Sequence, residues 1–287
     1  MKVRQIGAVL AASVLTLGLA ACGDSANDSG SGSGSGGDAS GGTGKAVKIG
    51  IKFDQPGLGL KKGEDYAGLD VDVAKYVAKE LGSGEGDITW VQAPSAQRET
   101  LISTGQVDMI FATYSITDKR KETVSFAGPY FVAGQDLLVR GDDSSITGPE
   151  TLTGKKLCSV TGSTSAQKVK DKYPGVQLQE FGTYSECVAA LVSKGVDALT
   201  TDNTILAGYA SQDQYKGKLK VVGKTFSEER YGVGIKKGDT ALCEKINTAL
   251  TKMVDSGDWQ KAVDANLGPA GFKVDTAVNP PKPDACS

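Results

Sequence analysis

Hydrophobic and polar positions follow two different periods in the chain after residue 45. Residues 47–53 alternate with a period of two, as in a strand that is half buried in a sheet. Apolar positions recur at helical spacing between Leu69 and Leu81, and Gly82 follows as a C-terminal stop. Two more strands and a short helix are expected at 87–91, 106–112 and 95–104. This order predicts an α/β region whose helices cover a largely parallel sheet.

The same α/β pattern is repeated in the second half of the chain. Strands are expected at 155–160, 176–181, 196–201 and 218–222. Helices are expected between them, at 165–173, at 184–194 and from 202 on. Two final helices, 239–255 and 256–266, need a sheet to cover, and the first region offers one. The Pro-rich end, 280–283, is expected to lie extended along the surface.

If the final helices return to the first region, the chain crosses between two lobes twice. The crossings are expected near Gly134–Leu138 and near Arg230–Gly234, and two extended crossings form a hinge. The lobe boundaries that follow are 45–134 plus 235–287 for lobe 1 and 135–234 for lobe 2.

The first 44 residues have the composition of an export signal and a tether. Lys2 and Arg4 precede an apolar run that is too short to span a bilayer comfortably, and Leu19-Ala20-Ala21-Cys22 follows. This sequence resembles the lipobox of bacterial lipoproteins, which implies a signal peptide at 1–21 and a lipid, palmitate included, on Cys22. The alternative is an ordinary secreted protein. Residues 23–44 are almost wholly small and polar, so a flexible Gly/Ser tether is expected over 22–44.

Composition excludes several kinds of chemistry. The chain has no histidine, which removes Ser-His and Cys-His nucleophilic pairs and imidazole metal sites. The formal net charge is -2 without a basic patch, so nucleic acid is not an expected partner. No Cys-x-x-Cys pair occurs, and neither a metal nor a cofactor is expected.

Four cysteines remain beside Cys22, and an even number in an exported chain indicates disulfides. Three connectivities are possible, with buried free thiols as the alternative. We favour Cys158–Cys187 and Cys243–Cys286, because each bridge then lies within one expected lobe.

Candidate binding chemistry lies where the strand at 106–112 ends. Hydroxyl residues follow, Thr117 is placed to cap a helix, and Arg120 comes three residues later. Arg120 can bind a carboxylate through two parallel hydrogen bonds, while Ser115 and nearby amides take the remaining lone pairs. The alternative is that Arg120 is a solvated charge in the run 119–121.

The motifs around this stretch resemble those of bacterial extracellular solute-binding proteins of family 3, the polar amino-acid receptors of ABC importers. Residues 115–120, S-I-T-D-K-R, and 126–130, F-A-G-P-Y, resemble the family's "(S/T)-I-T-x-x-R … F-S-x-P-Y", and 68–73, G-L-D-V-D-V, resembles "G-F-D-V-D-L". The resemblance runs from about Val47 to about Asn266. It implies a two-lobed α/β fold of the type II periplasmic-binding-protein kind that closes on an amino acid.

The resemblance also implies residue roles. Arg120 and Ser115 bind the ligand's α-carboxylate, and the turn at Ser163-Thr164, where the family has a "G-T-T" loop, adds N–H donors. Asp202 binds the α-ammonium with help from the Thr113 carbonyl. The alternative for Asp202 is a plain helix N-cap.

Side-chain specificity is expected to depend on Lys52 and Arg98, which resemble positions where receptors for acidic amino acids carry cations. Two cations suit a second carboxylate and favour glutamate, with glutamine, asparagine and aspartate as alternatives. The other interpretation is that Lys52 points to solvent and Arg98 pairs with Glu99 or Glu64.

We therefore expect a monomeric, lipid-anchored receptor on the outer face of the cytoplasmic membrane that delivers its ligand to ABC permease subunits. An enzyme is the competing hypothesis, since some relatives on this fold are dehydratases. A dehydratase needs a spare acid and base at the site, and the sequence indicates none, so we expect no catalysis. A signalling ectodomain would need a spanning helix or output domain.

Overall fold

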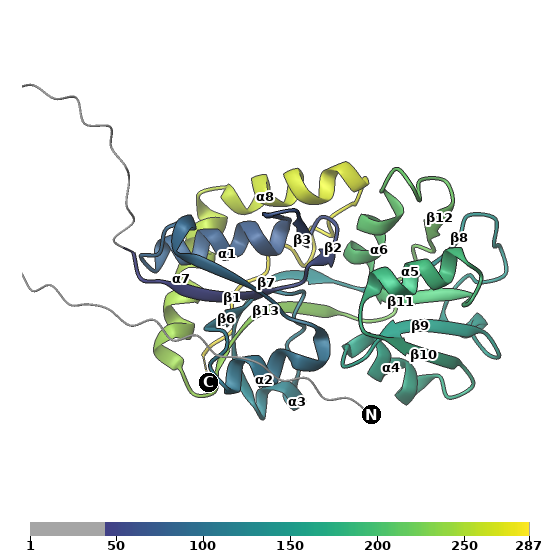
Figure 1. The fold of residues 1–287 in the computed structure, drawn as a ribbon, viewed down its shortest axis with the longest axis horizontal. Coiled ribbons are helices and arrows are strands. Elements are labelled where there is room, and N and C mark those ends of the chain that lie inside the picture. The colour runs from purple at the N-terminus through teal and green to yellow at the C-terminus, as the bar shows by residue number, and fades with distance from the viewer. Residues whose placement is uncertain (1–43, 287) are drawn as a thin grey trace, which may run out of the picture. The chain divides into compact units, whose positions relative to one another are not determined.

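The computed structural model describes residues 44–286. The expected signal peptide, Cys22 and most of the tether lie outside the described residues. The described part contains two five-stranded sheets and a small three-stranded one, shown in Figure 1. Its elements therefore form two α/β lobes.

The first sheet has the strand order β5-β1-β6-β13-β7. Its strands are β1 (Val47–Ile51), β5 (Ile88–Gln92), β6 (Met109–Ile110), β7 (Val124–Ala133) and β13 (Glu229–Lys236). β1 pairs in parallel with β5 and β6, whereas β13 runs antiparallel to β6 and β7. Its helices are α1 (Leu69–Glu80), α2 (Arg98–Ser103), α3 (Asp118–Lys121), α7 (Thr240–Asp255) and α8 (Asp258–Leu267).

The second sheet repeats this plan with the order β10-β9-β11-β8-β12. Its strands are β8 (Gln135–Arg140), β9 (Lys156–Val160), β10 (Gln177–Phe181), β11 (Ala198–Asp202) and β12 (Leu219–Val221). β9 is parallel to β10 and β11, and β8 is antiparallel to β11 and β12. Its helices are α4 (Thr164–Lys172), α5 (Tyr184–Val192) and α6 (Asn203–Ala210).

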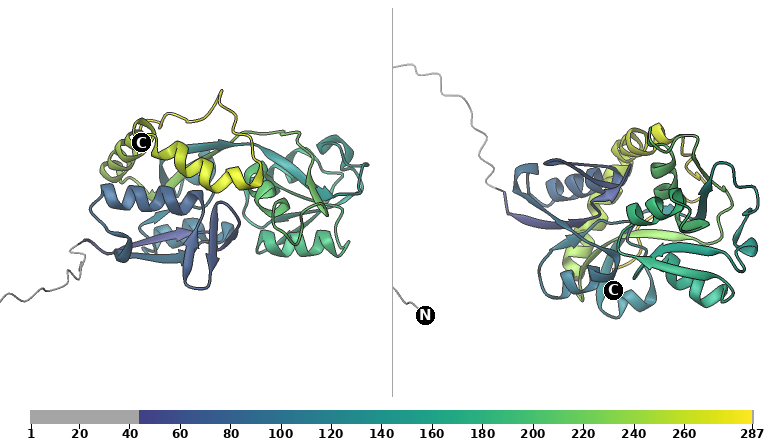
Figure 2. Two further views of the ribbon diagram at one scale, coloured as in Figure 1. Left: turned by 90° about the horizontal axis from the view of Figure 1, so that it is seen from above. Right: turned by 45° about the vertical axis from the view of Figure 1, so that its right-hand side comes forward.

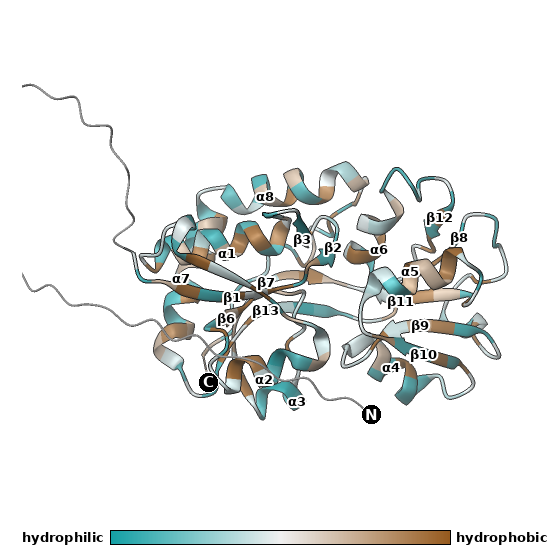
Figure 3. Cartoon of the chain, viewed as in Figure 1, coloured by the Kyte–Doolittle hydropathy of each residue, from teal (hydrophilic) through white to brown (hydrophobic). Residues whose placement is uncertain are grey.

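The helices form where the apolar spacing predicts them. The buried residues of α1 include Leu69, Val73 and Val77, four positions apart, and Gly82 after the helix has a φ of 90° that favours glycine. In the view by hydropathy, hydrophobic residues are concentrated in the sheet strands and on inner helix faces (Figure 3). The expected helix at 95–104 is divided into a 3-10 turn, 95–97, and α2.

The sequence from 54 to 63 is rich in Gly and Pro and is typical of a loop, but residues 54–67 are not a loop. They form the small sheet of β2 (Asp54–Gln55), β3 (Gly59–Lys62) and β4 (Asp65–Ala67). Gly57 and Gly59 serve close approaches, whereas Gly63 has a φ of 61° in the turn between β3 and β4. A Cβ at Gly59 would lie 2.6 Å from the Lys52 carbonyl oxygen.

Two hinge crossings join the lobes. The first is at Gly134, which alone separates β7 in one sheet from β8 in the other. The second was expected near Arg230–Gly234, but β13 pairs with β7 from Glu229 onward and so belongs to the first sheet. The amides of Val222 and Phe226 still bond to β8 carbonyls. We therefore propose residues 227–228 as the second crossing, so that lobe 1 resumes at Glu229 rather than at 235.

The C-terminal segment, 272–286, lies along the free edge of β7 and is here called the strap. The Asn279 side chain accepts a hydrogen bond from the Val132 amide and donates one to the Val132 carbonyl, each 2.9 Å long. The Asp284 amide bonds to the Gly128 carbonyl. Figure 2 shows this end of the chain running beside the first lobe.

Both favoured disulfides are confirmed. Cys158 is bonded to Cys187, which joins β9 to α5, and Cys243 is bonded to Cys286, which fixes the end of the strap to α7. Each bridge lies within the set of elements that surrounds one large sheet.

Candidate functional site

The expected binding stretch begins directly after β6, at the carboxyl end of a parallel strand. Thr113 there has a φ of 47°, which is unusual for a residue with a side chain. The buried carboxylate of Asp70, in the first turn of α1, accepts the Thr113 amide at 3.0 Å and the Tyr130 hydroxyl at 2.6 Å. Burial raises the pKa of Asp70 to about 6. These bonds hold the turn in its strained conformation.

Arg120 is buried, with 8% of its surface exposed, and is therefore not a solvated member of the run 119–121. Thr117 caps its helix as expected, because its hydroxyl accepts the Arg120 amide at 3.2 Å. The guanidinium donates to the carbonyls of Ser115, at 2.7 Å, and Gly162, at 3.1 Å. Burial and the nearby Arg98 lower the pKa of Arg120 to about 10, so the group stays charged at neutral pH.

Lys52 and Arg98 are buried in the same lobe, so Lys52 does not point to solvent. The Lys52 ammonium donates to the Ser95 hydroxyl at 2.8 Å, and Arg98 donates to the Ala112 carbonyl at 2.9 Å. Among residues 44–286, the Arg98 Nε has no hydrogen-bond partner. Burial and then Arg98 lower the pKa of Lys52 to about 7.

The Tyr114 ring lies against both guanidinium groups. The central carbons of Arg98 and Arg120 lie 4.2 Å and 4.9 Å from the centre of its ring, and its hydroxyl donates to Glu99 at 2.8 Å. Glu99 was one of the partners that the alternative interpretation gave to Arg98. Its carboxylate lies 3.3 Å from the Arg120 Nε and pairs with Arg120 instead. This stacking holds both cations in fixed orientations.

Lobe 2 contributes the N-terminus of α4. Ser163 is the N-cap, and its hydroxyl accepts the Ala166 amide at 3.0 Å. The Thr164 hydroxyl lies 3.4 Å from the Ser115 hydroxyl and donates to Glu229 at 2.9 Å. The structure thus brings Ser115 and Arg120 into direct contact with residues 162–164 of the other lobe.

Asp202 ends β11 and precedes α6, but its side chain does not cap that helix. Its carboxylate instead accepts the Tyr231 hydroxyl at 2.7 Å. Burial, followed by the repulsion of Glu229, raises the pKa of Asp202 to about 8. Within residues 44–286, no hydrogen bond or ion pair joins Asp202 to Thr113, Lys52 or Arg98.

The sequence analysis did not identify Glu229 and Tyr231, two buried polar residues on β13. Glu229 accepts hydrogen bonds from Thr164, from Ser227 at 2.8 Å and from the Lys168 ammonium. Burial alone would raise the pKa of Glu229, but the charge of Lys168 and the hydrogen bonds from Lys168, Ser115 and Ser227 together bring the pKa below the usual value. The available signal was a carboxylate and a phenol in the return strand, just before its apolar part at 232–235.

The described residues show no sign of a metal centre. Between residues 44 and 286, no cluster of three or more His, Cys, Asp and Glu side chains is placed to hold a metal ion. None of the helices that the structure describes is long and apolar enough to cross a membrane.

Comparison with known proteins places these features in a family. Residues 47–277 match the bacterial extracellular solute-binding proteins, family 3. The glutamate-binding protein GluB of Corynebacterium glutamicum is 50% identical over 276 residues, which cover 92% of this chain and 90% of the relative. The ABC transporter glutamine-binding protein GlnH of Bacillus subtilis is 38% identical over 75% of this chain and 78% of its own length.

Solved structures agree with the sequence match. An ancestral arginine-binding protein bound to glutamine is 36% identical, with a TM-score of 0.72 over 77% of this chain and 97% of that one. The match to the family, the sequence relatives and the solved structure agree with one another. The chain belongs to the bacterial extracellular solute-binding proteins of family 3.

Proposed function

We propose that this protein is the extracellular substrate-binding lipoprotein of an ABC transporter and binds an amino acid, glutamate, between its two lobes. The observation that carries the proposal is the distribution of buried charge. Lys52, Arg98 and Arg120 are buried cations of lobe 1, and Asp202 is a buried carboxylate of lobe 2. A ligand with two carboxylates and one ammonium complements this set.

The α-carboxylate is assigned to Arg120. A guanidinium has five N–H donors, and protein oxygens of Ser115, Gly162 and Glu99 occupy three of its directions, so two remain for a ligand. Ser115 and the amides at Ser163-Thr164, where α4 begins, complete the site, since a helix N-terminus favours an anion.

The α-ammonium is assigned to Asp202, with the Thr113 carbonyl as its second acceptor. A pKa of about 8 leaves this carboxyl largely protonated at neutral pH, and an adjacent ammonium favours its ionised form. Binding should therefore release a proton from Asp202.

The ligand's side chain is assigned to Lys52 and Arg98. The unpartnered Arg98 Nε and the ammonium of Lys52 offer donors to a second carboxylate. The name of the Corynebacterium relative supports glutamate, and that of the Bacillus relative supports glutamine as the alternative. Aspartate and asparagine carry the same groups on a shorter chain.

Export and anchoring complete the proposal. Cleavage before Cys22 and lipidation of its sulfur would anchor a monomer to the outer face of the cytoplasmic membrane, where it delivers its ligand to the permease. No catalytic step is assigned, because the charged groups that could act on a substrate are engaged by an amino acid's own charges.

Calorimetry on refolded protein tests the ligand. Glutamate should bind more tightly than glutamine, asparagine and aspartate, and the double variant Lys52→Ala/Arg98→Ala should lose the preference for glutamate over glutamine. Lys61→Ala, which removes an exposed lysine above the Phe53 and Tyr66 rings, is the control. An unchanged ratio of the two affinities in the double variant would contradict the acidic-ligand assignment.

A further inference from the structure

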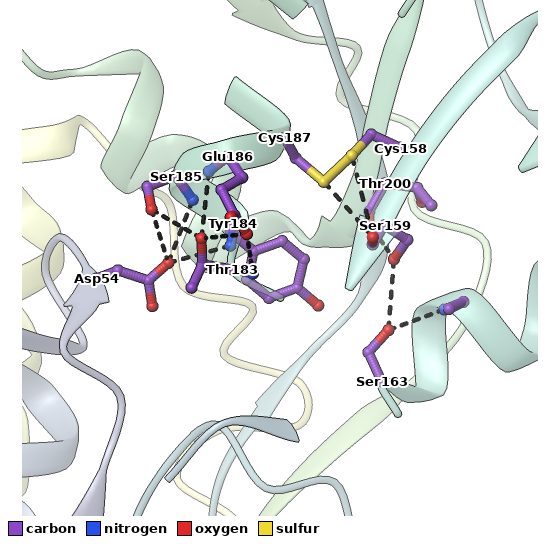
Figure 4. Close-up of a disulfide and its surroundings, with 11 residues drawn as sticks. Asp54, Cys158, Ser159, Ser163, Thr183, Tyr184, Ser185, Glu186, Cys187 and Thr200 are labelled. Atoms are coloured by element: carbon purple, nitrogen blue, oxygen red, sulfur yellow. Dashed lines mark hydrogen bonds between the residues drawn. A yellow bond between two sulfur atoms is a disulfide. The ribbon is translucent and has the colours of Figure 1, made fainter. Parts of the chain in front are cut away.

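Asp54 joins the two lobes without being part of the proposed ligand site. It lies in β2, on lobe 1, and its carboxylate accepts hydrogen bonds from the amides of Tyr184 and Ser185, at 3.0 and 3.2 Å. Both amides are in the first turn of α5, in lobe 2. Figure 4 shows Asp54 reaching from one ribbon toward the start of α5. A carboxylate at this position is favoured by the helix dipole.

Two hydroxyl groups of lobe 2 strengthen the contact. The Ser185 hydroxyl lies 3.4 Å from the same carboxylate oxygen, and the Tyr209 hydroxyl, on α6, lies 3.2 Å from it. Tyr209 also donates to the Asp54 carbonyl. Asp54 therefore bonds to two separate helices of the other lobe.

Glycines allow the lobes to approach this closely. A Cβ at Gly208, the residue before Tyr209 on α6, would lie 2.1 Å from the carbonyl oxygen of Pro56, beside Asp54. A Cβ at Gly162 would lie 2.7 Å from the Cα of Ala96 in lobe 1. The Gly208–Pro56 contact is incompatible with any side chain at 208 unless the lobes separate.

The helix that receives Asp54 also carries a residue that faces the proposed site. Tyr184 is buried, and its surroundings include Ser163, Thr201 and Asp202, the first and last of which are assigned to the ligand. The Cys158–Cys187 bridge ties this helix to β9, as Figure 4 shows. The position of α5 therefore determines how lobe 2 is presented to lobe 1.

We infer that Asp54 is a positioning residue: with the Gly208–Pro56 contact, it holds α5 and α6 against lobe 1 and thereby favours the closed arrangement in which the amino acid is bound. We call this set of contacts the Asp54 latch. All of its partners are protein atoms, so it acts on closure whether or not a ligand is present. Its effect on affinity rests on the proposed function, whereas its effect on lobe closure does not.

Two variants separate the latch from specificity. Asp54→Ala removes the acceptor, and Gly208→Ala puts a methyl group against Pro56. Alanine has a better helix propensity than glycine, so Gly208→Ala should not lower the thermal stability of the ligand-free protein. Asp143→Ala is the matched control, because Asp143 accepts from the amide and hydroxyl of Ser145 within one loop of lobe 2.

The first measurement is small-angle X-ray scattering without added amino acid. Both latch variants should have a larger radius of gyration than the wild type and Asp143→Ala. Scattering curves that coincide for all four proteins would overturn the latch. If the latch variants expand but wild-type protein binds no amino acid, the proposed function fails and the latch stands.

The second measurement is calorimetry with glutamate and glutamine. Loss of closure should weaken both affinities by the same factor, about tenfold, because a population shift acts on every ligand alike. Loss for only one ligand would make Asp54 a specificity residue and overturn the positioning role. Wild-type affinity of Gly208→Ala for both ligands would also overturn it.

Discussion

The two lobes contribute to the proposed site in different ways. Lobe 1 supplies three buried cations, two of which are stacked on the Tyr114 ring and bonded to main-chain carbonyls. Lobe 2 supplies hydroxyls, a helix N-terminus and one carboxylate whose pKa is raised. The cations of lobe 1 have internal supports, whereas Asp202 takes its hydrogen bond from Tyr231 of the first sheet. This difference suggests that lobe 1 captures the ligand and that lobe 2 completes the site on closure.

The strongest test of that division is Arg120→Ala. Removing one partner of a buried charge pair costs about 2–5 kcal/mol, so affinity for any amino acid should fall by roughly 30-fold or more. Isothermal titration calorimetry measures this, with circular dichroism to establish that the variant is folded. Lys119→Ala removes the exposed neighbouring charge and should bind normally. Wild-type affinity in Arg120→Ala would contradict the hypothesis that lobe 1 captures the ligand first.

A smaller effect on ligand affinity is expected from pH. Rising pH removes the charge of Lys52 in lobe 1 and ionises Asp202 in lobe 2. Lys52 has a pKa of about 7, and a second ligand carboxylate favours its charged form, so the contribution of Lys52 to glutamate affinity should fall as pH rises above 7. Glutamine lacks that carboxylate, and both ligands share Asp202. The ratio of glutamate to glutamine affinity should therefore fall by up to about tenfold per pH unit above 7. Lys52→Met should make this ratio independent of pH.

Calorimetry with both ligands between about pH 6 and 8.5 gives this ratio, since free glutamate keeps a single net charge over that range. A ratio that is constant in the wild type would show that Lys52 does not contact the ligand's side chain.

The smallest expected change in ligand affinity comes from removing the two disulfides one at a time. They enclose sequence separations of 29 and 43 residues, so serine at both positions of either bridge should lower the free energy of unfolding by about 2–4 kcal/mol. Cys158–Cys187 ties β9 to the helix of the Asp54 latch, so its loss should also weaken ligand affinity several-fold. Loss of Cys243–Cys286, which fixes the strap to α7, should leave affinity unchanged.

Urea unfolding and calorimetry on the two double variants test this contrast. If both double variants changed ligand affinity equally, the Cys158–Cys187 bridge would have no specific effect on the proposed ligand site.

Local patterns were sufficient to predict the elements that bury an apolar face. Helix α1 and the N-cap at Thr117 follow from apolar spacing and residue type. An even cysteine count indicated disulfides, and the expected lobes favoured one of three connectivities. The resemblance to a family supplied the candidate roles of Arg120 and Asp202, and burial of both agrees with those roles without testing them.

What the sequence did not reveal depends on contacts between distant residues. The small sheet at 54–67 was hidden because two of its glycines, Gly57 and Gly59, serve close packing, which the sequence pattern does not distinguish from a loop. The carboxylate of Glu229 and the phenol of Tyr231 did not by themselves indicate a role, since their partners lie far away in the chain, on α4 and β11. The boundary that we propose for lobe 2 differs from the expected one for a similar reason. Only the pairing with β7 shows that residues 229–234 belong to the first sheet.

The strap has a consequence for solubility. β7 is a ten-residue, wholly buried strand at the margin of its sheet, and such a margin is a template for pairing with a second polypeptide. Asn279 and Asp284 occupy main-chain groups of this margin, at Val132 and Gly128. A shortened chain that ends before Asn279 would expose those groups to intermolecular association, which makes the last residues a safeguard against aggregation.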